Sequence, residues 1–360
     1  MECKNVEYLT VLVSKDEDDG IPRIVWPESN ENDGESITND PIVLLEQIQA
    51  RYPTNEPAFY PKISISVDAS RSNIMRLPGV MPRNSDPDLM SASPFLFRKD
   101  GTMVAKSSHC VSIEELEEMM EEYDSGLYIC GKDLTAADLV WISYMERYAA
   151  QLPLIFPKVD VLNPRSSSYE LVAEWCKAVE RNVPAYACRV MGDARHWRGC
   201  LEQSVEVHNA RAQDGEAVDK LAPIPKRKRW WLKSNPRSQE LWKDYVCGDG
   251  KLIRPWMADT PEQEAGLYLL KNRDRIMTAF AAASNGSTEA ADEALREIVQ
   301  QLIQWHPREE GDECDKTASS NAKTLLEVLV HSIQVPIDLG MVPAVALGEL
   351  LVKMEADVET

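Results

Sequence analysis

The segment at residues 131–153, GKDLTAADLVWISYMERYAAQLP, constrains the fold of this chain most strongly. Thr135 and Asp138 have the spacing of a capping box, in which Thr135 accepts the backbone N–H of Asp138 and Asp138 accepts that of Thr135. Leu134 and Leu139 occupy the two positions of a hydrophobic staple. The helix that follows is apolar nearly all round, which is typical of a helix buried on every side. The segment therefore predicts a helical bundle built around this helix.

Helical patterns dominate the chain after residue 110. A helix is predicted from Ser112 onward, and the six glutamates between residues 114 and 122 are interpreted as its solvated face. Thr260, Pro261 and Gln263 supply the cap, the first-turn proline and the box position of another helix start. Helices are predicted at 168–182, 261–283, 288–305, 321–333 and 342–354, and polar loops at 203–225 and 307–320.

The N-terminal 53 residues have the pattern of part of an α/β domain. Residues 8–14 form a short apolar stretch, and residues 21–26 have the composition of a strand that opens on a proline. Residues 41–52 have helical spacing and begin with a proline at the first helical position. Pro, Ser, Asn and Asp are frequent in residues 54–94, which we expect to form a linker.

Charge and hydropathy exclude several classes of partner. The 360 residues carry a net charge of −20, from 59 acidic and 39 basic residues. This negative field repels phosphate backbones, so we expect no nucleic-acid partner. No apolar run approaches the roughly 18 residues of a membrane span, and the N-terminus does not have the pattern of a signal or transit peptide. We therefore expect a cytoplasmic protein without membrane contact.

Cysteine and histidine spacing argues against a metal site. No two of the eight cysteines are separated by only two residues, and the five histidines are scattered. His109 and Cys110 alone supply too few ligands for zinc. We expect no metal, and thiols that are mostly reduced and buried.

One basic cluster stands out in this acidic chain, at Lys226 to Arg229, followed by two tryptophans. Such a cluster suits a nuclear-localisation signal or an acidic partner. Basic residues beside aromatic ones also suit single-stranded nucleic acid. The interpretation we favour is a loop that pairs with the protein's own acidic surface.

Two blocks of the sequence resemble the glutathione transferase superfamily. Residues 21–52 look like that family's third and fourth strands and third helix, with Pro22 at its cis-proline. Residues 131–153 and 169–193 look like its interior helix and the helix that follows. Three segments are most similar to a plant and algal omega-like subgroup with an extra C-terminal helical region. They are ERYAAQLP, VPAYACRV and VPIDLGMVPAVAL.

The resemblance implies a mainly α protein, with a transferase-like helical domain and a partial thioredoxin-like (α/β) remnant in front of it. It divides the chain into four parts: the thioredoxin-like remnant at 1–53, the linker at 54–94, the helical domain at 95–202 and a helical extension at 203–360.

The resemblance also implies glutathione as a possible ligand. The positions that match the family's glutathione-binding segments are Pro22, Arg23, Ile24, Asn39 and Asp40. A helix N-terminus at Pro41 favours a carboxylate, although relatives carry a Glu/Gln-Ser pair where this chain has Asn39 and Asp40. Arg147 and Tyr148 lie on the helix that lines the family's cleft. They are candidate ligand contacts, and the alternative is a structural role for both.

Catalysis in the omega-like relatives uses a cysteine at the start of the first helix, where the helix N-terminus lowers the thiol pKa. Here 21 residues precede Pro22, too few for a strand, a helix and a second strand. Cys3 is the only cysteine before Cys110 and lies in a polar terminus, so no catalytic residue is assigned.

For a complete chain, we therefore expect a catalytically weak or silent binding or assembly module. Its partner would be glutathione or another protein, and its oligomeric state stays open. The alternative is an omega-like glutathione transferase, or glutathione-dependent thiol reductase, whose catalytic segment is missing from this sequence.

Overall fold

The computed structural model describes residues 41–53, 106–122, 126–156, 163–192, 194–210, 221, 237–248, 253–284, 287–304, 320–335 and 338–356. Within these ranges the chain is helical and contains no β-strand, apart from an isolated bridge between Tyr128 and Gly131. The expectation of a mainly α protein is confirmed for this part of the chain. The strands predicted before residue 53 lie outside the described residues.

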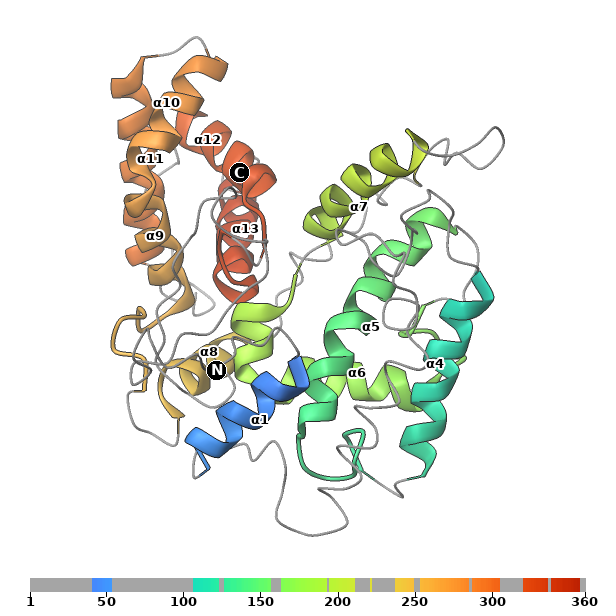
Figure 1. Cartoon of the computed structure of the whole chain (residues 1–360). Helices are drawn as coiled ribbons and strands as arrows, with labels where there is room; N and C mark the ends of the chain where they lie inside the picture. The colour runs from blue at the N-terminus through green and yellow to red at the C-terminus, as the bar shows by residue number, and fades with distance from the viewer. Residues whose placement is uncertain are drawn as a thin grey trace, which may run out of the picture. The chain divides into compact units, whose positions relative to one another are not determined.

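Figure 1 shows the helices in chain order from blue to red. They are α1 (Pro41–Arg51), α4 (Lys106–Glu121), α5 (Ala136–Ile155), α6 (Glu170–Asn182), the π-helical turn η3 (Tyr186–Val190), α7 (Ala194–Asn209), α8 (Ser238–Val246), α9 (Pro261–Lys271), α10 (Arg273–Ser284), α11 (Thr288–Ile303), α12 (Ser320–Ser332) and α13 (Met341–Ala356).

One predicted polar loop is wrong, because residues 203–209 belong to α7. Trp197, Leu201 and Val205 recur every four residues, and Leu201 and Val205 are buried. This spacing is an apolar helical stripe. Polar side chains between these positions obscured the stripe in the sequence. The short helix α8 was also not predicted.

The single helix predicted at 261–283 is divided into α9 and α10 at Asn272. The Asn272 side chain donates from Nδ2 to the Tyr268 carbonyl at 2.9 Å, a local bond that competes with helix continuation. At the start of α9 the predicted cap is confirmed. Thr260 Oγ1 accepts the backbone N–H of Gln263 at 3.2 Å, and Pro261 occupies the first turn.

The chain divides into two compact units. Unit 1 comprises residues 1–149, 158–178 and 207–217, and unit 2 comprises residues 150–157, 179–206 and 218–360. The described helices α1 and α4 therefore belong to unit 1, and α8 to α13 belong to unit 2. The helices α5 and α6 begin in unit 1 and end in unit 2.

The core of unit 1 is built from large side chains of α4, α5 and α6. Ile113, Trp141, Tyr148 and Trp175 are almost completely inaccessible to solvent. The helix α5 is buried around most of its circumference, as its composition predicted, and Ser143 lies on its exposed side.

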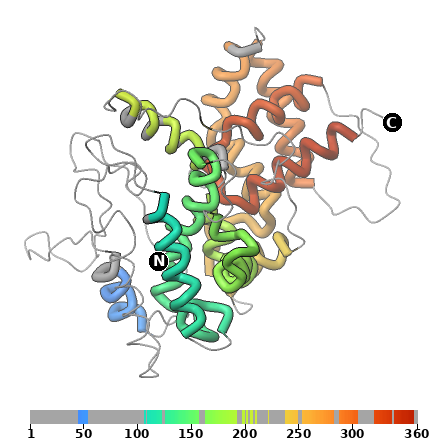
Figure 2. Tube along the Cα trace, turned by 90° about the vertical axis from the view of Figure 1, so that its right-hand side faces the viewer, coloured from blue at the N-terminus to red at the C-terminus, as the bar shows by residue number. Residues whose placement is uncertain are grey.

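The core of unit 2 is a bundle of α9 to α13, grouped in orange and red in Figure 2. Helix α11 packs against α9, α10 and α12, and α13 packs against α9, α12 and η3. Gly340 permits the last of these contacts, because a Cβ at that position would overlap the carbonyl oxygen of Cys188. Among the described helices, none has the length and apolar character needed to cross a membrane.

Candidate functional site

The most completely bonded polar group of unit 1 is the Asp138 carboxylate, which is fully buried. Its Oδ1 accepts the backbone N–H of Ile129 and the indole N–H of Trp175, both at 2.9 Å. Its Oδ2 accepts the backbone N–H of Thr135 at 2.7 Å and the Thr135 hydroxyl at 2.9 Å. The predicted bond from the Thr135 backbone to Asp138 is thus present, whereas the Thr135 hydroxyl donates to the carboxylate.

The local chain geometry brings these donors to Asp138. Tyr128 and Gly131 exchange two backbone hydrogen bonds at 2.9 and 3.0 Å, and Gly131 adopts a φ of 109°, which favours glycine. Ile129 lies between them in the chain, and its backbone N–H reaches Asp138 in the first turn of α5. Burial raises the pKa of Asp138, and its hydrogen bonds act in the opposite direction. Through its hydrogen bonds, the Asp138 carboxylate connects the turn at residues 128–131 with α5 and α6. This is a structural role.

Tyr148, one of the two candidates for a ligand contact, lies in the core. Its hydroxyl is hydrogen-bonded to His109 Nδ1 at 3.2 Å and donates to Ser112 Oγ at 3.5 Å. The Tyr148 and His109 rings meet edge to face with centroids 5.3 Å apart. Helix α4 covers this side of α5, so Tyr148 has the structural surroundings that were the alternative to a ligand contact. The neighbouring Arg147 is half-buried.

Burial also sets the protonation of this cluster. His109 has no exposed surface, and its burial lowers its pKa to about 4. Burial raises the pKa of Tyr148 above its ordinary value. Both side chains are therefore neutral at physiological pH, as expected of groups in a folded core.

Glu117 has a role that the sequence did not reveal. Its Oε1 accepts the backbone N–H of Leu171 at 3.1 Å, and its Oε2 accepts that of Val172 at 2.9 Å. A side chain of α4 therefore caps the N-terminus of α6. The glutamate run was interpreted as a solvated face, and Glu117 departs from this interpretation because it pairs with donors 54 and 55 residues away.

Two thiols in the described residues have raised pKa values. Burial, followed by the charge of Glu114, raises the pKa of Cys110. Burial raises the pKa of Cys188 in η3, and the nearby Arg254 guanidinium only partly offsets this effect. Arg254 is itself buried, donates to the Tyr245 carbonyl and stacks over the Tyr245 ring at 4.1 Å. Neither thiol has the lowered pKa of an activated nucleophile.

Several predicted positions lie outside the described residues. They are Pro22, Arg23, Ile24, Asn39, Asp40, Cys3 and the basic cluster at 226–229. Within the described ranges, no three or more His, Cys, Asp and Glu side chains are grouped as ligands for a metal ion.

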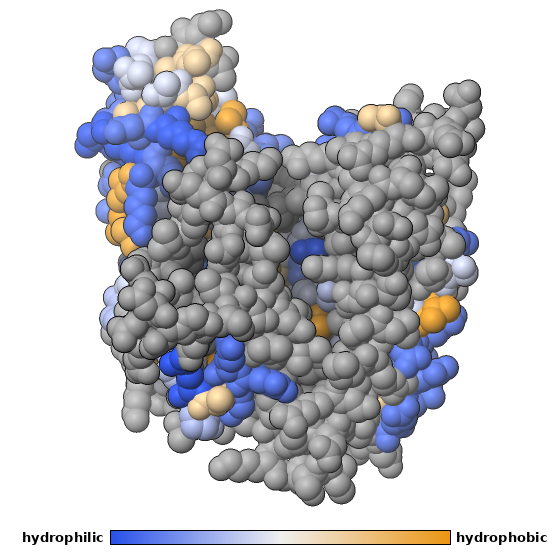
Figure 3. All heavy atoms as spheres, in the orientation of Figure 1, coloured by the Kyte–Doolittle hydropathy of each residue, from blue (hydrophilic) through white to orange (hydrophobic). Residues whose placement is uncertain are grey.

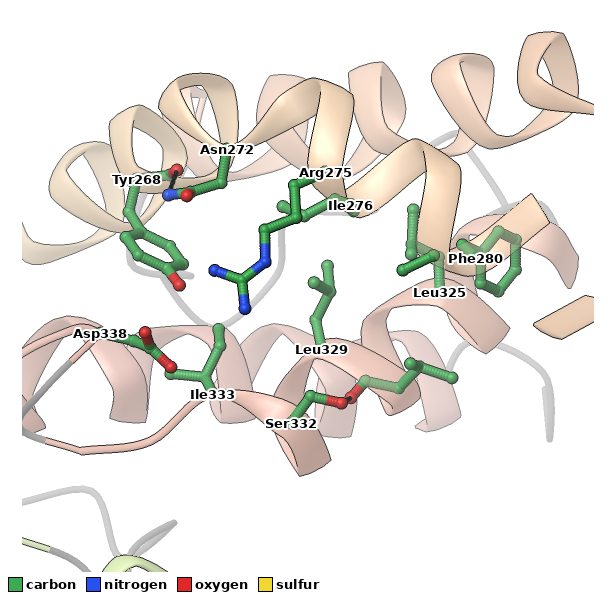
Figure 4. Close-up of a pocket in the computed structure, with 12 residues that line it drawn as sticks. Tyr268, Asn272, Arg275, Ile276, Phe280, Leu325, Leu329, Ser332, Ile333 and Asp338 are labelled. Carbon is green, nitrogen blue, oxygen red and sulfur yellow. Dashed lines mark hydrogen bonds between the residues drawn. The ribbon is translucent and has the colours of Figure 1, made fainter. Parts of the chain in front are cut away.

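Unit 2 contains a groove between α10 and α12, with a volume of about 210 Å³ (Figure 4). Most of its apolar part is formed by buried or half-buried side chains of both helices. Figure 4 shows Ile276 and Phe280 on one helix facing Leu325 and Leu329 on the other. Val328, which is 41% exposed, completes the lining from α12.

Polar side chains gather at one end of this groove (Figure 4). Tyr268 and Asn272 come from the end of α9, Arg275 from α10 and Asp338 from the segment before α13. Burial and the charge of Asp338 raise the pKa of Tyr268, and the charge of Arg275 opposes them. Figure 4 shows the Arg275 and Asp338 side chains at the same end of the groove as Tyr268. An apolar wall with a few convergent polar groups is typical of a small-molecule site.

A second apolar area of unit 2 is flatter. Leu267, Leu270 and Ile303 are between 41% and 52% exposed on α9 and α11. Hydrophobic atoms lie over these helices at the left edge of Figure 3. This area is more open than the groove between α10 and α12, which is therefore the stronger candidate among the described surfaces.

Comparison with known proteins adds no relative from which function can be transferred. No family model matches the chain, and no curated protein or solved structure matches it either. The function is therefore argued from the geometry of the two units.

Proposed function

We propose that this protein is a catalytically silent binding module of the glutathione transferase type, which holds a small ligand in the groove between α10 and α12. The single observation that carries the proposal is the groove itself, in which an apolar wall ends at Arg275 and Asp338. An apolar wall beside a few convergent polar groups is the composition typical of a small-molecule site.

The buried network of unit 1 supports the same proposal. Asp138 uses both carboxylate oxygens to hold the turn, α5 and α6, which leaves unit 1 the character of a rigid scaffold. The raised pKa values of Cys110 and Cys188 are the opposite of what thiol transfer requires.

Ligand binding in the groove is tested with an apolar fluorescent probe, 1-anilinonaphthalene-8-sulfonate, on the full chain. Val328→Lys places a charged chain on the groove wall at a position that is already 41% exposed. The matched control is Val352→Lys on α13, where Val352 is 50% exposed and does not line the groove. We expect V328K to weaken probe binding by about tenfold, or about 1.4 kcal/mol, and V352K to leave it unchanged. Equal binding by both variants would contradict the proposal.

The second candidate function is an omega-like glutathione transferase or thiol reductase. The resemblance implies it, and the Thr135–Asp138 pair at the start of α5 is equally compatible with both functions. The assay is turnover of hydroxyethyl disulfide with glutathione, together with calorimetric titration of glutathione. The proposed silent module gives neither turnover nor glutathione binding. Turnover at an enzymatic rate would overturn it in favour of the transferase.

A further inference from the structure

The charges at the end of the groove differ from the other charges on the same helix. Arg273, at the start of α10, is paired with Asp292, with 2.7 Å between its Nε and a carboxylate oxygen. Arg275, two residues later, has no carboxylate oxygen within 4 Å among the described residues, and its guanidinium extends toward α12 beside Tyr268 (Figure 4). The Arg275 charge is therefore directed into the groove.

Asp338 presents the opposite charge to the same space. Its Oδ2 accepts the backbone N–H of Gln334 at 2.9 Å, which fixes the carboxylate against its own turn. In the described part of the chain, its Oδ1 accepts no hydrogen bond. Figure 4 shows the carboxylate at the end of the groove, across from the Arg275 guanidinium. A ligand at this end meets one cation and one anion.

The apolar part of the groove lies next to these charges. Leu325, Leu329 and Phe280 are at most 8% exposed and form a fixed wall. The volume of about 210 Å³ lies below the roughly 300–1,000 Å³ of sites for drug-sized ligands. The groove therefore suits a small molecule with one apolar branch.

We propose that the groove binds a free apolar α-amino acid of the size of leucine or phenylalanine. The carboxylate of the amino acid pairs with Arg275, its ammonium group pairs with Asp338, and its side chain lies against Leu329 and Phe280. A simple fatty acid would bring a second carboxylate to Asp338, and a simple amine would bring a second cation to Arg275. Both are disfavoured by like charge, so the pair selects a zwitterion. This inference rests on the proposed function of the groove.

Equilibrium dialysis of the full chain with radiolabelled leucine and phenylalanine tests the assignment. Two competitors isolate each charge: 4-methylpentanoate has no ammonium group, and 3-methylbutylamine has no carboxylate. We expect each competitor to bind about tenfold more weakly than leucine. Arg275→Gln and Asp338→Asn should each weaken leucine binding by about tenfold, whereas the control Lys271→Gln, at an exposed position outside the groove, should not.

The proposal also predicts which single-charge ligand each variant should bind. Asp338→Asn keeps an amide oxygen for the Gln334 N–H. It should bring the affinity for 4-methylpentanoate close to that for leucine. Arg275→Gln should bring the affinity for 3-methylbutylamine close to that for leucine in the same way. Equal binding of all three ligands, or leucine binding that is unchanged in both variants, overturns the amino-acid assignment.

The failure of this inference differs from the failure of the proposed function. If V328K weakens binding of the fluorescent probe but millimolar leucine and phenylalanine show no saturable binding, the amino-acid assignment is overturned and the groove is retained. If V328K and V352K bind the probe equally, the groove itself is overturned.

Discussion

Two clusters of charge in this molecule differ in how completely they are hydrogen-bonded. In unit 1 the Asp138 carboxylate is fully buried and accepts four hydrogen bonds. In unit 2 Arg275 is exposed and Asp338 is half-buried, and both lie at the end of an apolar groove. The comparison teaches that a charge bonded on all sides acts on stability, whereas an exposed charge beside an apolar wall is available to a ligand.

The largest effect is expected from Asp138→Ala in unit 1. The substitution leaves the backbone N–H groups of Ile129 and Thr135 and the indole N–H of Trp175 buried without an acceptor. At about 1–3 kcal/mol for each of these three buried unsatisfied donors, we expect a loss of at least about 3 kcal/mol in the free energy of unfolding. Urea unfolding followed by circular dichroism measures this loss. Arg275→Gln is the matched comparison from unit 2, and it should change the same free energy by less than about 0.5 kcal/mol. A loss below about 1 kcal/mol for Asp138→Ala would remove the contrast between the two clusters.

The next effect concerns His109, the buried titratable partner of Tyr148. Its folded pKa of about 4 lies below its ordinary value of 6.5. As the pH falls below about 6.5, the unfolded chain takes up the proton first, so the contribution of neutral His109 to stability is present above that pH and is lost toward pH 4. The shift corresponds to about 3 kcal/mol.

The measurement is the free energy of unfolding between pH 7 and pH 4 for the wild type and for His109→Asn, which keeps a polar atom near the Tyr148 hydroxyl but does not titrate. The wild type should lose about 3 kcal/mol more than the variant over this range. Parallel curves would show that His109 is not held neutral by the core.

The smallest of these effects is expected from Glu117→Ala. The variant removes the acceptor of two N–H groups at the start of α6, and loss of a helix cap costs about 1 kcal/mol. Glu117→Gln keeps an acceptor oxygen and should lose less. The control is Glu118→Ala, from the exposed side of the same helix, which should be nearly neutral. Equal losses in the free energy of unfolding for Glu117→Ala and Glu118→Ala would show that Glu117 belongs to the solvated face.

The parts of the molecule that the sequence predicted correctly depend on residues close together in the chain. Thr135 and Asp138 are three residues apart, and Thr260 and Gln263 also, so local spacing was enough to locate the starts of α5 and α9. The mainly α character followed from helical periodicity. By contrast, the division at Asn272 depends on one side-chain bond that competes with the helix.

The missed features depend on pairs that are far apart in the chain. Trp175 reaches Asp138 across 37 residues, and Glu117 reaches Leu171 across 54. The groove brings Arg275 and Asp338 together only after α10 and α12 have packed. No local pattern encodes such contacts, which explains why the sequence did not reveal the groove.

The central claim is that the charges of the groove serve a ligand and not the fold. Equilibrium dialysis of radiolabelled leucine against the wild type and Arg275→Gln tests it most directly, with unfolding midpoints recorded on the same samples. We predict binding that is about tenfold weaker in the variant at an unchanged midpoint. Equal binding by the two proteins, or a midpoint that falls together with the binding, would contradict the claim.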